Sequence, residues 1–231
     1  MDRPARPTRG RGASDGALST REVLLLTAER LYAHEGLAAV SLRRINREAG
    51  QLNASALHYH FGTRDELLTA ILDFRMGQVN RRRLDLLDDL RAAGRAQDVL
   101  ALTDALIRPL SEHIGGAPAA AGSHYLGFLA STFNSAEVNV YRMTAQREDH
   151  SLRKLSALFV EALPDLPEAL VRIRFSVNVR SVIYSMADWE RDRVIGKLQS
   201  RMSFDAFIAM LVDMTAAAMS VPPAQPFRPK P

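Results

Sequence analysis

The segment from Ser41 to Leu68 constrains the fold of this chain most, because it holds three places where a helix can begin and two where one can end. Ser41, Asn53 and Thr63 have side-chain oxygens that accept hydrogen bonds from the free backbone N–H groups at a helix N-terminus. Glu66 follows Thr63 by three positions, which is the spacing of a capping box. The segment therefore predicts three helices in quick succession.

Gly50 and Gly62 mark the two helix ends, because glycine adopts the left-handed conformation that often follows a helix. The pattern predicts one helix over 41–49, a second over 53–61 and a third that starts at Arg64. Two short helices joined by a tight glycine-containing turn form a helix-turn-helix. The second helix has small residues first and long polar aromatic residues after them, so it can lie in the major groove of DNA.

A longer pattern surrounds this motif and covers residues 19–68. Its helix positions and helix ends are Leu24, Leu25, Ala28, Leu31, Tyr32, Gly36, Ser41, Ile45, Ala49, Gly50, Leu57, His58, Tyr59, His60, Phe61 and Gly62. In these residues the chain resembles the TetR family of bacterial transcriptional regulators. The run from Leu57 to Gly62 and the capped turn after it are the most specific part of the match. The resemblance departs at Gln51-Leu52-Asn53, where the common turn of the family is one residue shorter.

Beyond Arg64 the sequence favours long helices and carries few strand signals. Glycine and proline mark the breaks between them. We expect helices at about 64–93, 97–114, 121–133, 135–163, 167–190 and 203–220. The predicted fold is all-α, with an N-terminal three-helix helix-turn-helix domain followed by a larger helical ligand-binding and dimerisation bundle. The predicted division is a disordered basic arm over 1–18, a DNA-binding domain over 19–63, an effector-binding and dimerisation domain over 64–220, and a disordered proline-rich tail over 221–231.

The charge of the chain is concentrated in the segment that holds the motif. Residues 1–64 contain ten Lys or Arg and six Asp or Glu, whereas residues 65–231 contain twenty of each, so the whole net charge of +4 lies in the first segment. This is the electrostatic footprint of a nucleic-acid-binding module. A basic tail that keeps the protein in solution is the alternative. The arginines of the first 18 residues either reach a minor groove or phosphates or form a solvated tail.

Several classes of site are not expected. The chain has no cysteine, so it forms neither disulfides nor thiolate zinc sites, which fits a cytoplasmic location. It has no run of 18 apolar residues, so we expect no membrane span. His58 and His60 point about 200° apart on a helix, which prevents them from chelating one metal ion. We find no serine nucleophile motif, and we expect no metal, no cofactor and no catalytic residue.

The candidate DNA contacts come from the starts of the helices and from the second helix of the motif. Asn53 is expected to cap that helix, and residues 55 and 56 are small enough for close approach to a groove. Histidine and tyrosine side chains can donate to phosphates or bases. The resemblance implies backbone contacts from positions 58–60 and a phosphate contact from position 64. The full set is Ser41, Arg43, Arg44, Asn53, Ser55, Ala56, His58, Tyr59, His60 and Arg64. Two alternatives stay open, namely partial core packing for Tyr59 and a solvated position for Arg44.

The last two predicted helices carry apolar residues on more than one face, so each is buried on more than one side. The alternatives are packing in the monomer core and pairing with a second copy in a four-helix interface. The resemblance favours the dimer, because family members dimerise through their last two long helices. The candidate interface residues are Leu170, Ile173, Val177, Tyr184, Phe204, Phe207, Ile208, Leu211 and Met214.

The resemblance also implies a cavity for a small-molecule effector in the second domain. Pockets between the helices of a bundle are lined by apolar and aromatic residues, although each such residue alone is more often plain core. Asn178 is a polar group that can orient a ligand or pair across a dimer. The candidates are Tyr125, Phe128, Phe133, Tyr141, Phe175, Asn178, Met186 and Trp189.

The sequence thus predicts a homodimeric regulator, a repressor that a mostly apolar small molecule releases from a pseudo-palindromic double-stranded DNA operator. One alternative is an all-α enzyme or small-molecule carrier with an incidental helix-turn-helix. A second is an architectural protein that binds nucleic acid without a defined site.

Overall fold

The computed structural model describes residues 18–53, 55–115, 123–135, 150–194 and 202–227. All regular secondary structure in these ranges is α-helical, as the sequence predicts. The helices are α1 (Thr20–Glu35), α2 (Leu42–Glu48), α3 (Ala56–Phe61), α4 (Arg64–Ala92), α5 (Val99–Gly115), α6 (Tyr125–Phe133), α8 (His150–Ala162), α9 (Glu168–Val194) and α10 (Phe204–Ser220).

Side-chain caps fix where the helices begin. Ser19 and Glu22 form a complete capping box at α1, and Thr63 and Glu66 form another at α4. The Ser41 hydroxyl accepts the backbone N–H of the third residue of α2. These bonds satisfy amide groups that have no partner inside their own helix. The predicted starts of α2 and α4 are confirmed to within one residue.

Three predicted boundaries need correction. α3 begins at Ala56 rather than at Asn53, because the Asn53 side chain accepts the Ser55 N–H in a turn before the helix. α9 continues to Val194, so Arg191 lies within a helix and not in the expected loop. Of the single helix expected over 135–163, the structure describes α8 from His150 onward, and the residues before it lie outside the described ranges.

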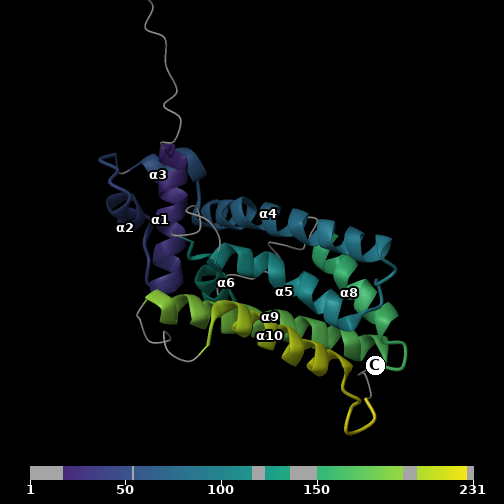
Figure 1. Ribbon diagram of the computed structural model, residues 1–231. Coiled ribbons are helices and arrows are strands. Elements are labelled where there is room, and N and C mark those ends of the chain that lie inside the picture. The colour runs from purple at the N-terminus through teal and green to yellow at the C-terminus, as the bar shows by residue number, and fades with distance from the viewer. Residues whose placement is uncertain (1–17, 54, 116–122, 136–149, 195–201, 228–231) are drawn as a thin grey trace, which may run out of the picture.

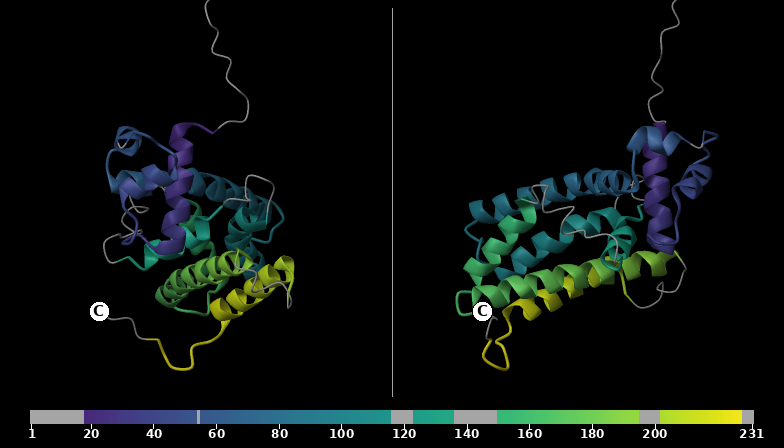
Figure 2. Two further views of the ribbon diagram at one scale, coloured as in Figure 1. Left: turned by 90° about the vertical axis from the view of Figure 1, so that its left-hand side faces the viewer. Right: turned by 180° about the vertical axis from the view of Figure 1, so that it is seen from behind.

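The helices are arranged in a long bundle with α1 standing across one end (Figure 1). α2 and α3 lie beside α1, and α4 runs from them along the length of the bundle. α9 and α10 lie side by side on the opposite face, with the C-terminal end of α9 near the C-terminal end of α1, as both further views also show (Figure 2). One continuous hydrophobic core joins the N-terminal helices to the bundle.

The face of α10 that was predicted to contact a second copy is mostly buried within the single chain. Phe207, Ile208 and Leu211, which we expected at a dimer interface, are buried within the chain at 8%, 5% and 7% exposure. Their side chains belong to the hydrophobic core that α10 shares with α5 and α9. The large apolar residue that is exposed on α10 is instead Met214, at 61% exposure. Three of the five candidate interface residues on α10 are therefore core residues of the single chain.

Most of the predicted N-terminal arm and part of the predicted tail lie outside the described ranges. Of the predicted basic arm over 1–18, only residue 18 lies within the described ranges, and of the predicted tail over 221–231 the described part, 221–227, contains no helix. In the described ranges, no helix has both the length and the apolar character that crossing a membrane requires.

Candidate nucleic-acid interface

α2 and α3 form the expected helix-turn-helix, and one buried side chain holds them together. The Asn46 side-chain oxygen accepts the backbone N–H of Leu57 at 3.2 Å. Leu57 is the second residue of α3, so its N–H has no acceptor within that helix. Asn46 is 4% exposed, and asparagine is a poor residue for the interior of a helix. Our sequence reasoning missed this contact, and the asparagine inside a short helix was the available signal.

Replacing Asn46 with alanine should lower the free energy of unfolding by about 1–3 kcal/mol, because a buried N–H then loses its acceptor. Urea denaturation followed by circular dichroism measures this loss. Arg47→Ala is the matched control, since its side chain is 74% exposed and most exposed substitutions change stability by less than about 0.5 kcal/mol. Equal midpoints for the two variants would contradict the role given to Asn46.

The outward face of α3 is polar and aromatic. Tyr59 is 85% exposed, which argues against the alternative that its ring packs in the core. The His58 ring nitrogen Nδ1 lies 2.8 Å from the Gly62 carbonyl oxygen, and this bond to a carbonyl requires an N–H at Nδ1. The other ring nitrogen, Nε2, is then free of a proton in the neutral ring. The His60 ring meets the Tyr59 ring edge to face, with centroids 5.1 Å apart.

Two small residues at the start of α3 lie on different sides. Ser55 is exposed and its side chain makes no capping hydrogen bond. Ala56 is 8% exposed and faces the interior, so close approach to a groove falls to Ser55 rather than to Ala56. Asn53 is exposed beside them and serves the preceding turn.

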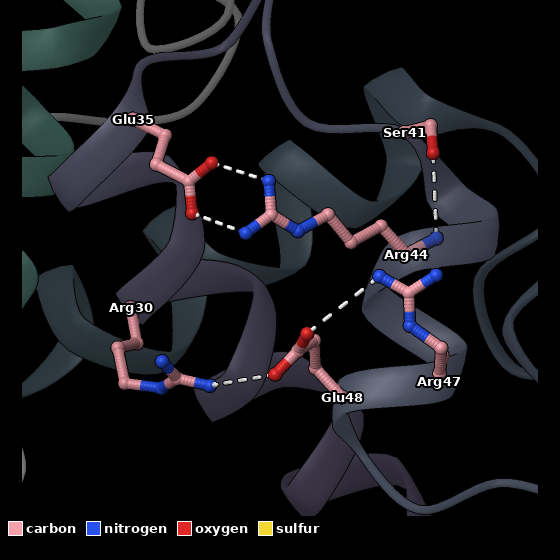
Figure 3. Close-up of polar contacts among 6 residues, drawn as sticks. All are labelled: Arg30, Glu35, Ser41, Arg44, Arg47 and Glu48. Carbon is pink, nitrogen blue, oxygen red and sulfur yellow. Dashed lines mark hydrogen bonds and ion pairs between the residues drawn. The ribbon is translucent and has the colours of Figure 1, made fainter.

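The arginines near α2 differ in how strongly they are held (Figure 3). Arg44 forms a bidentate ion pair with Glu35 at the end of α1. Arg44 Nη2 donates to Glu35 Oε1 at 2.7 Å, and Arg44 Nη1 donates to Glu35 Oε2. The Arg47 guanidinium lies 3.7 Å from one carboxylate oxygen of Glu48, and the Arg30 guanidinium lies 3.9 Å from the other oxygen. Because Arg44 ties α2 to α1, a positioning role fits it better than a freely solvated one.

The other two arginines among the predicted DNA contacts, Arg43 and Arg64, also differ in how strongly they are held by other residues. Arg43 is exposed on α2. The Arg64 guanidinium donates to the Leu37 carbonyl and lies 5.9 Å from the centre of the Tyr32 ring. Arg64 therefore braces the loop after α1, and its expected phosphate contact remains a prediction.

The capping carboxylate next to Arg64 is sensitive to pH. Hydrogen bonds from the Thr63 backbone, and then from its hydroxyl, lower the pKa of Glu66 below its ordinary 4.5. A lowered folded-state pKa stabilises the fold above the ordinary pKa, and this stabilisation is lost as the pH falls below it. The start of α4 is therefore held most firmly near neutral pH.

The N-terminal helices are tied to the bundle at the beginning of α6, which we call the α6 junction. The buried Glu29 of α1 accepts two hydrogen bonds from Arg75 of α4, at 2.7 and 3.0 Å. Glu29 also accepts the His124 N–H at 2.9 Å. On the other side Glu190 of α9 accepts the Gly127 N–H at 3.1 Å. Two buried carboxylates from distant helices thus bind the free amides of α6.

Glycine lets α1 pack closely on α6 at this junction. A methyl group placed on Gly127 would lie 3.1 Å from the Ala33 Cβ, a separation that atoms tolerate only with movement. A cleft of about 260 Å³ opens beside it, bordered by His34, His124 and Tyr184. Burial lowers the pKa of His124, and the neighbouring His34 acts in the same direction.

The eight predicted ligand residues do not surround one cavity in the described part of the chain. Tyr125, Phe128 and Met186 are completely buried core residues. The Trp189 ring stacks on the Phe207 ring of α10, with centroids 4.3 Å apart. Phe175 lines a groove that lies between α8 and α9.

The other three predicted ligand residues are placed as follows. The Phe133 ring packs against the Tyr184 ring of α9, with centroids 6.3 Å apart. The Asn178 amide donates to the Arg174 carbonyl at 2.9 Å, so it is used within the chain rather than being free to orient a ligand. Tyr141 lies outside the described residues.

The described ranges contain no group of three or more His, Asp or Glu side chains that are placed to hold a metal ion. What the geometry does provide is an exposed helix-turn-helix that is carried on a helical bundle.

Two family profiles match the chain. The profile described as bacterial regulatory proteins of the tetR family matches residues 24–71, and the profile described as the tetracyclin repressor-like C-terminal domain matches residues 104–218. The chain belongs to the TetR family. Members of the TetR family are DNA-binding transcriptional regulators and not enzymes, and this chain is such a regulator.

Solved structures of TetR-family proteins share the fold at low sequence identity. Native NalD of Pseudomonas aeruginosa, the secondary repressor of the MexAB-OprM multidrug efflux pump, aligns with a TM-score of 0.54 at 18% identity, over 86% of this chain and 96% of that one. A TetR-family regulator from Marinobacter aquaeolei VT8 aligns with a TM-score of 0.57 at 17% identity, over 86% and 94%. Among curated proteins, none matches.

Proposed function

We propose that this TetR-family regulator is a repressor that binds a pseudo-palindromic operator as a homodimer and leaves it when a small molecule binds. The observation that carries the DNA-binding part is the outward face of α3, where Tyr59 is 85% exposed beside His58 and Ser55. The sign of regulation is supported by NalD, which shares the fold and is described as a repressor.

The proposed division of labour follows the chain. Residues 19–63 read DNA and residues 64–220 bind the effector and the second copy. The segment 1–18 adds an arginine-rich arm, and 221–231 forms a tail. The exposed cations and donors near α2 and α3 then position the protein on phosphates, while α3 enters the groove.

The dimer is supported by an exposed apolar stripe on α9. Ile173 and Val177 are 52% and 50% exposed, and Leu170 is half-buried on the same helix face. On α10, Met214 is exposed together with the small residues Ala206 and Ala217. Apolar residues that repeat along the outer helices of a bundle suit an isologous interface with a second copy.

The same pattern limits which predicted residues face the partner. Half-buried Phe204 packs on Trp189, with ring centroids 5.9 Å apart. The Tyr184 hydroxyl donates to the Asn134 side chain at 2.8 Å, which ties Tyr184 to the end of α6. Leu170, Ile173, Val177 and Met214 therefore form the centre of the proposed interface.

Release by an effector follows from how the domains are connected. α4 begins directly after α3, with only Gly62 and Thr63 between them. A shift of the bundle changes the distance between the two α3 helices of a dimer, whereas half-sites on one DNA face lie about 34–36 Å apart. The effector must bind the released form better, by about 1.4 kcal/mol for a tenfold release.

The decisive experiment is selection of DNA fragments by the purified protein, followed by sequencing and footprinting. A shared palindromic sequence and a protected site of defined length would support the proposal. Protection without a defined site would favour the architectural alternative instead. A chain that retains no fragment above background would refute operator binding.

Replacing Tyr59 or His60 with alanine should weaken operator binding by about 1–3 kcal/mol for each variant, because each loses a contact to the DNA. Arg64→Ala should weaken specific and non-specific binding together and flatten the salt dependence. Mobility-shift titrations at several salt concentrations measure both effects. Arg91→Ala is the control, since its exposed side chain lies at the far end of α4. Wild-type affinity in all three test variants would mean that α3 does not read the operator.

A further inference from the structure

A groove lies between α8 and α9, and one of its lining residues is Phe175, a candidate ligand residue from the sequence. It has a volume of about 430 Å³, within the range of small-molecule pockets. Its lining residues are Leu152, Arg153, Ser156, Ala157, Arg172, Phe175, Ser176 and Val179. Small side chains at 156 and 157 on α8 and at 176 on α9 line this space.

The floor of the groove is apolar. Phe175 is 8% exposed, and its ring packs on the Phe159 ring with centroids 5.7 Å apart. Leu152 and Val179 are half-buried beside it. An apolar surface that remains partly open to water gains free energy when an apolar ligand covers it.

The charged side chains that line this floor are both basic. Two of the eight lining residues are arginines and none is acidic. The Arg172 guanidinium is oriented by Glu168 at 2.7 Å and reaches Ser156 of α8 at 3.5 Å, so it spans the groove. Arg153 is exposed on the α8 side, and no ion pair of its side chain is recorded within the described residues.

The dimensions favour a small molecule over a protein segment. On α9 the lining runs from Arg172 to Val179, which is about 10 Å at 1.5 Å per residue. A docked helix would need several turns of contact, whereas this length suits a medium-length acyl chain or one or two rings. Guanidinium groups bind carboxylates, sulfonates and phosphates through paired hydrogen bonds.

We propose that the α8–α9 groove binds an amphipathic organic anion, with its apolar part on Phe175 and Val179 and its acidic head between Arg153 and Arg172. The groove shares α9 with the exposed stripe at Ile173 and Val177. A ligand in the groove therefore contacts the helix that carries the proposed dimer interface. Its effect on DNA rests on the proposed function, whereas its binding does not.

The test is isothermal titration calorimetry of the full chain with decanoate, below the concentration at which micelles form. Decyltrimethylammonium has the same apolar chain with the opposite charge, and acetate has the head group alone. We expect decanoate to bind once per chain, at least about tenfold more tightly than either comparison compound, since charge-assisted hydrogen bonds and apolar contact both contribute.

Arg153→Glu should weaken decanoate binding by at least about tenfold, because it reverses a charge at the head-group position. Arg191→Glu is the matched control, because it makes the same charge change on α9 about 28 Å from Arg172 along the helix axis. Ala157→Trp should fill the groove and abolish binding. If this variant unfolds, Ser176→Phe fills the same space from α9.

Equal binding of the anion and the cation would overturn the proposal. Unchanged binding in Arg153→Glu, or no decanoate binding by the wild type, would overturn it as well. Operator affinity is measured separately, with and without decanoate. Binding without a change in operator affinity would refute only the coupling to DNA, and failure to bind any operator without decanoate would refute the proposed function while leaving the groove intact.

Discussion

Replacing Glu29 with alanine should lower the free energy of unfolding by about 3–5 kcal/mol, because it leaves a buried guanidinium without its carboxylate. Glu29 is completely buried and Arg75 is only 7% exposed. The substitution also removes the acceptor of the His124 N–H at the start of α6. The loss is measured by urea denaturation followed by circular dichroism, and it should exceed that of any exposed charge substitution.

Two control variants test whether the loss of stability comes from leaving a charge buried without a partner or from losing an ion pair as such. The pair of Arg82 and Glu112 has a similar separation of 3.0 Å, but its side chains are 43% and 46% exposed. Glu112→Gln should therefore cost only about 0–1 kcal/mol. The double substitution Glu29→Met with Arg75→Leu removes both buried charges, and its loss should be well below that of Glu29→Ala. A Glu29→Ala variant as stable as Glu112→Gln would show that this pair does not hold α1 to α4.

The parts of the fold that the sequence predicts well are those decided by neighbours in the chain. The capping boxes at Ser19 and Thr63 place the starts of α1 and α4, and each depends on a glutamate three positions away. Gly36 and Gly62 end their helices with positive φ values of 81° and 70°, which glycine adopts most readily. The ends of α1 and α3 and the start of α4 were therefore predictable, whereas the start of α3 was placed three residues too early.

The candidate site was harder to predict because its side chains are committed by residues far away in the sequence. Arg44 forms an ion pair with Glu35, and Arg64 donates a hydrogen bond to the Leu37 carbonyl 27 positions earlier. Helical periodicity alone predicts neither of these two contacts. The Glu29 and Arg75 pair spans 46 positions, and only the packing of α1 against α4 brings the two together.

The apolar residues of the last helices illustrate the same limit. A helix that is apolar on two faces packs on both sides, but its sequence does not say which side lies inside its own chain. On α10 the side with Phe207 and Leu211 is buried in the bundle, and Met214 remains outside. On α9 the stripe at Ile173 and Val177 remains outside. Of the predicted interface residues, Ile173 and Val177 on α9 and Met214 on α10 therefore remain available to a second copy, whereas Phe207, Ile208 and Leu211 are buried in the bundle.

Val177→Glu should convert the protein to a folded monomer and reduce operator affinity by about a hundredfold or more, since linking two DNA-binding units raises their joint affinity by about 10²–10⁴. The wild-type side chain is 50% exposed in the single chain, so the glutamate remains solvated there and folding is preserved. In a dimer the same carboxylate would be buried without a partner. Sedimentation at micromolar concentration and mobility-shift titration measure the two effects.

Two further substitutions distinguish loss of the dimer from loss of the fold. Leu100→Glu is matched in exposure, at 49%, but lies on α5, so it should leave both the dimer and operator affinity unchanged. Leu211→Glu places a charge in the core of the single chain and should unfold it, because an unpaired buried charge is not tolerated. A Val177→Glu protein that sediments as a dimer would place the interface elsewhere. If it is monomeric and still binds the full operator as tightly as the wild type, then each half-site is read independently and dimerisation does not supply the affinity.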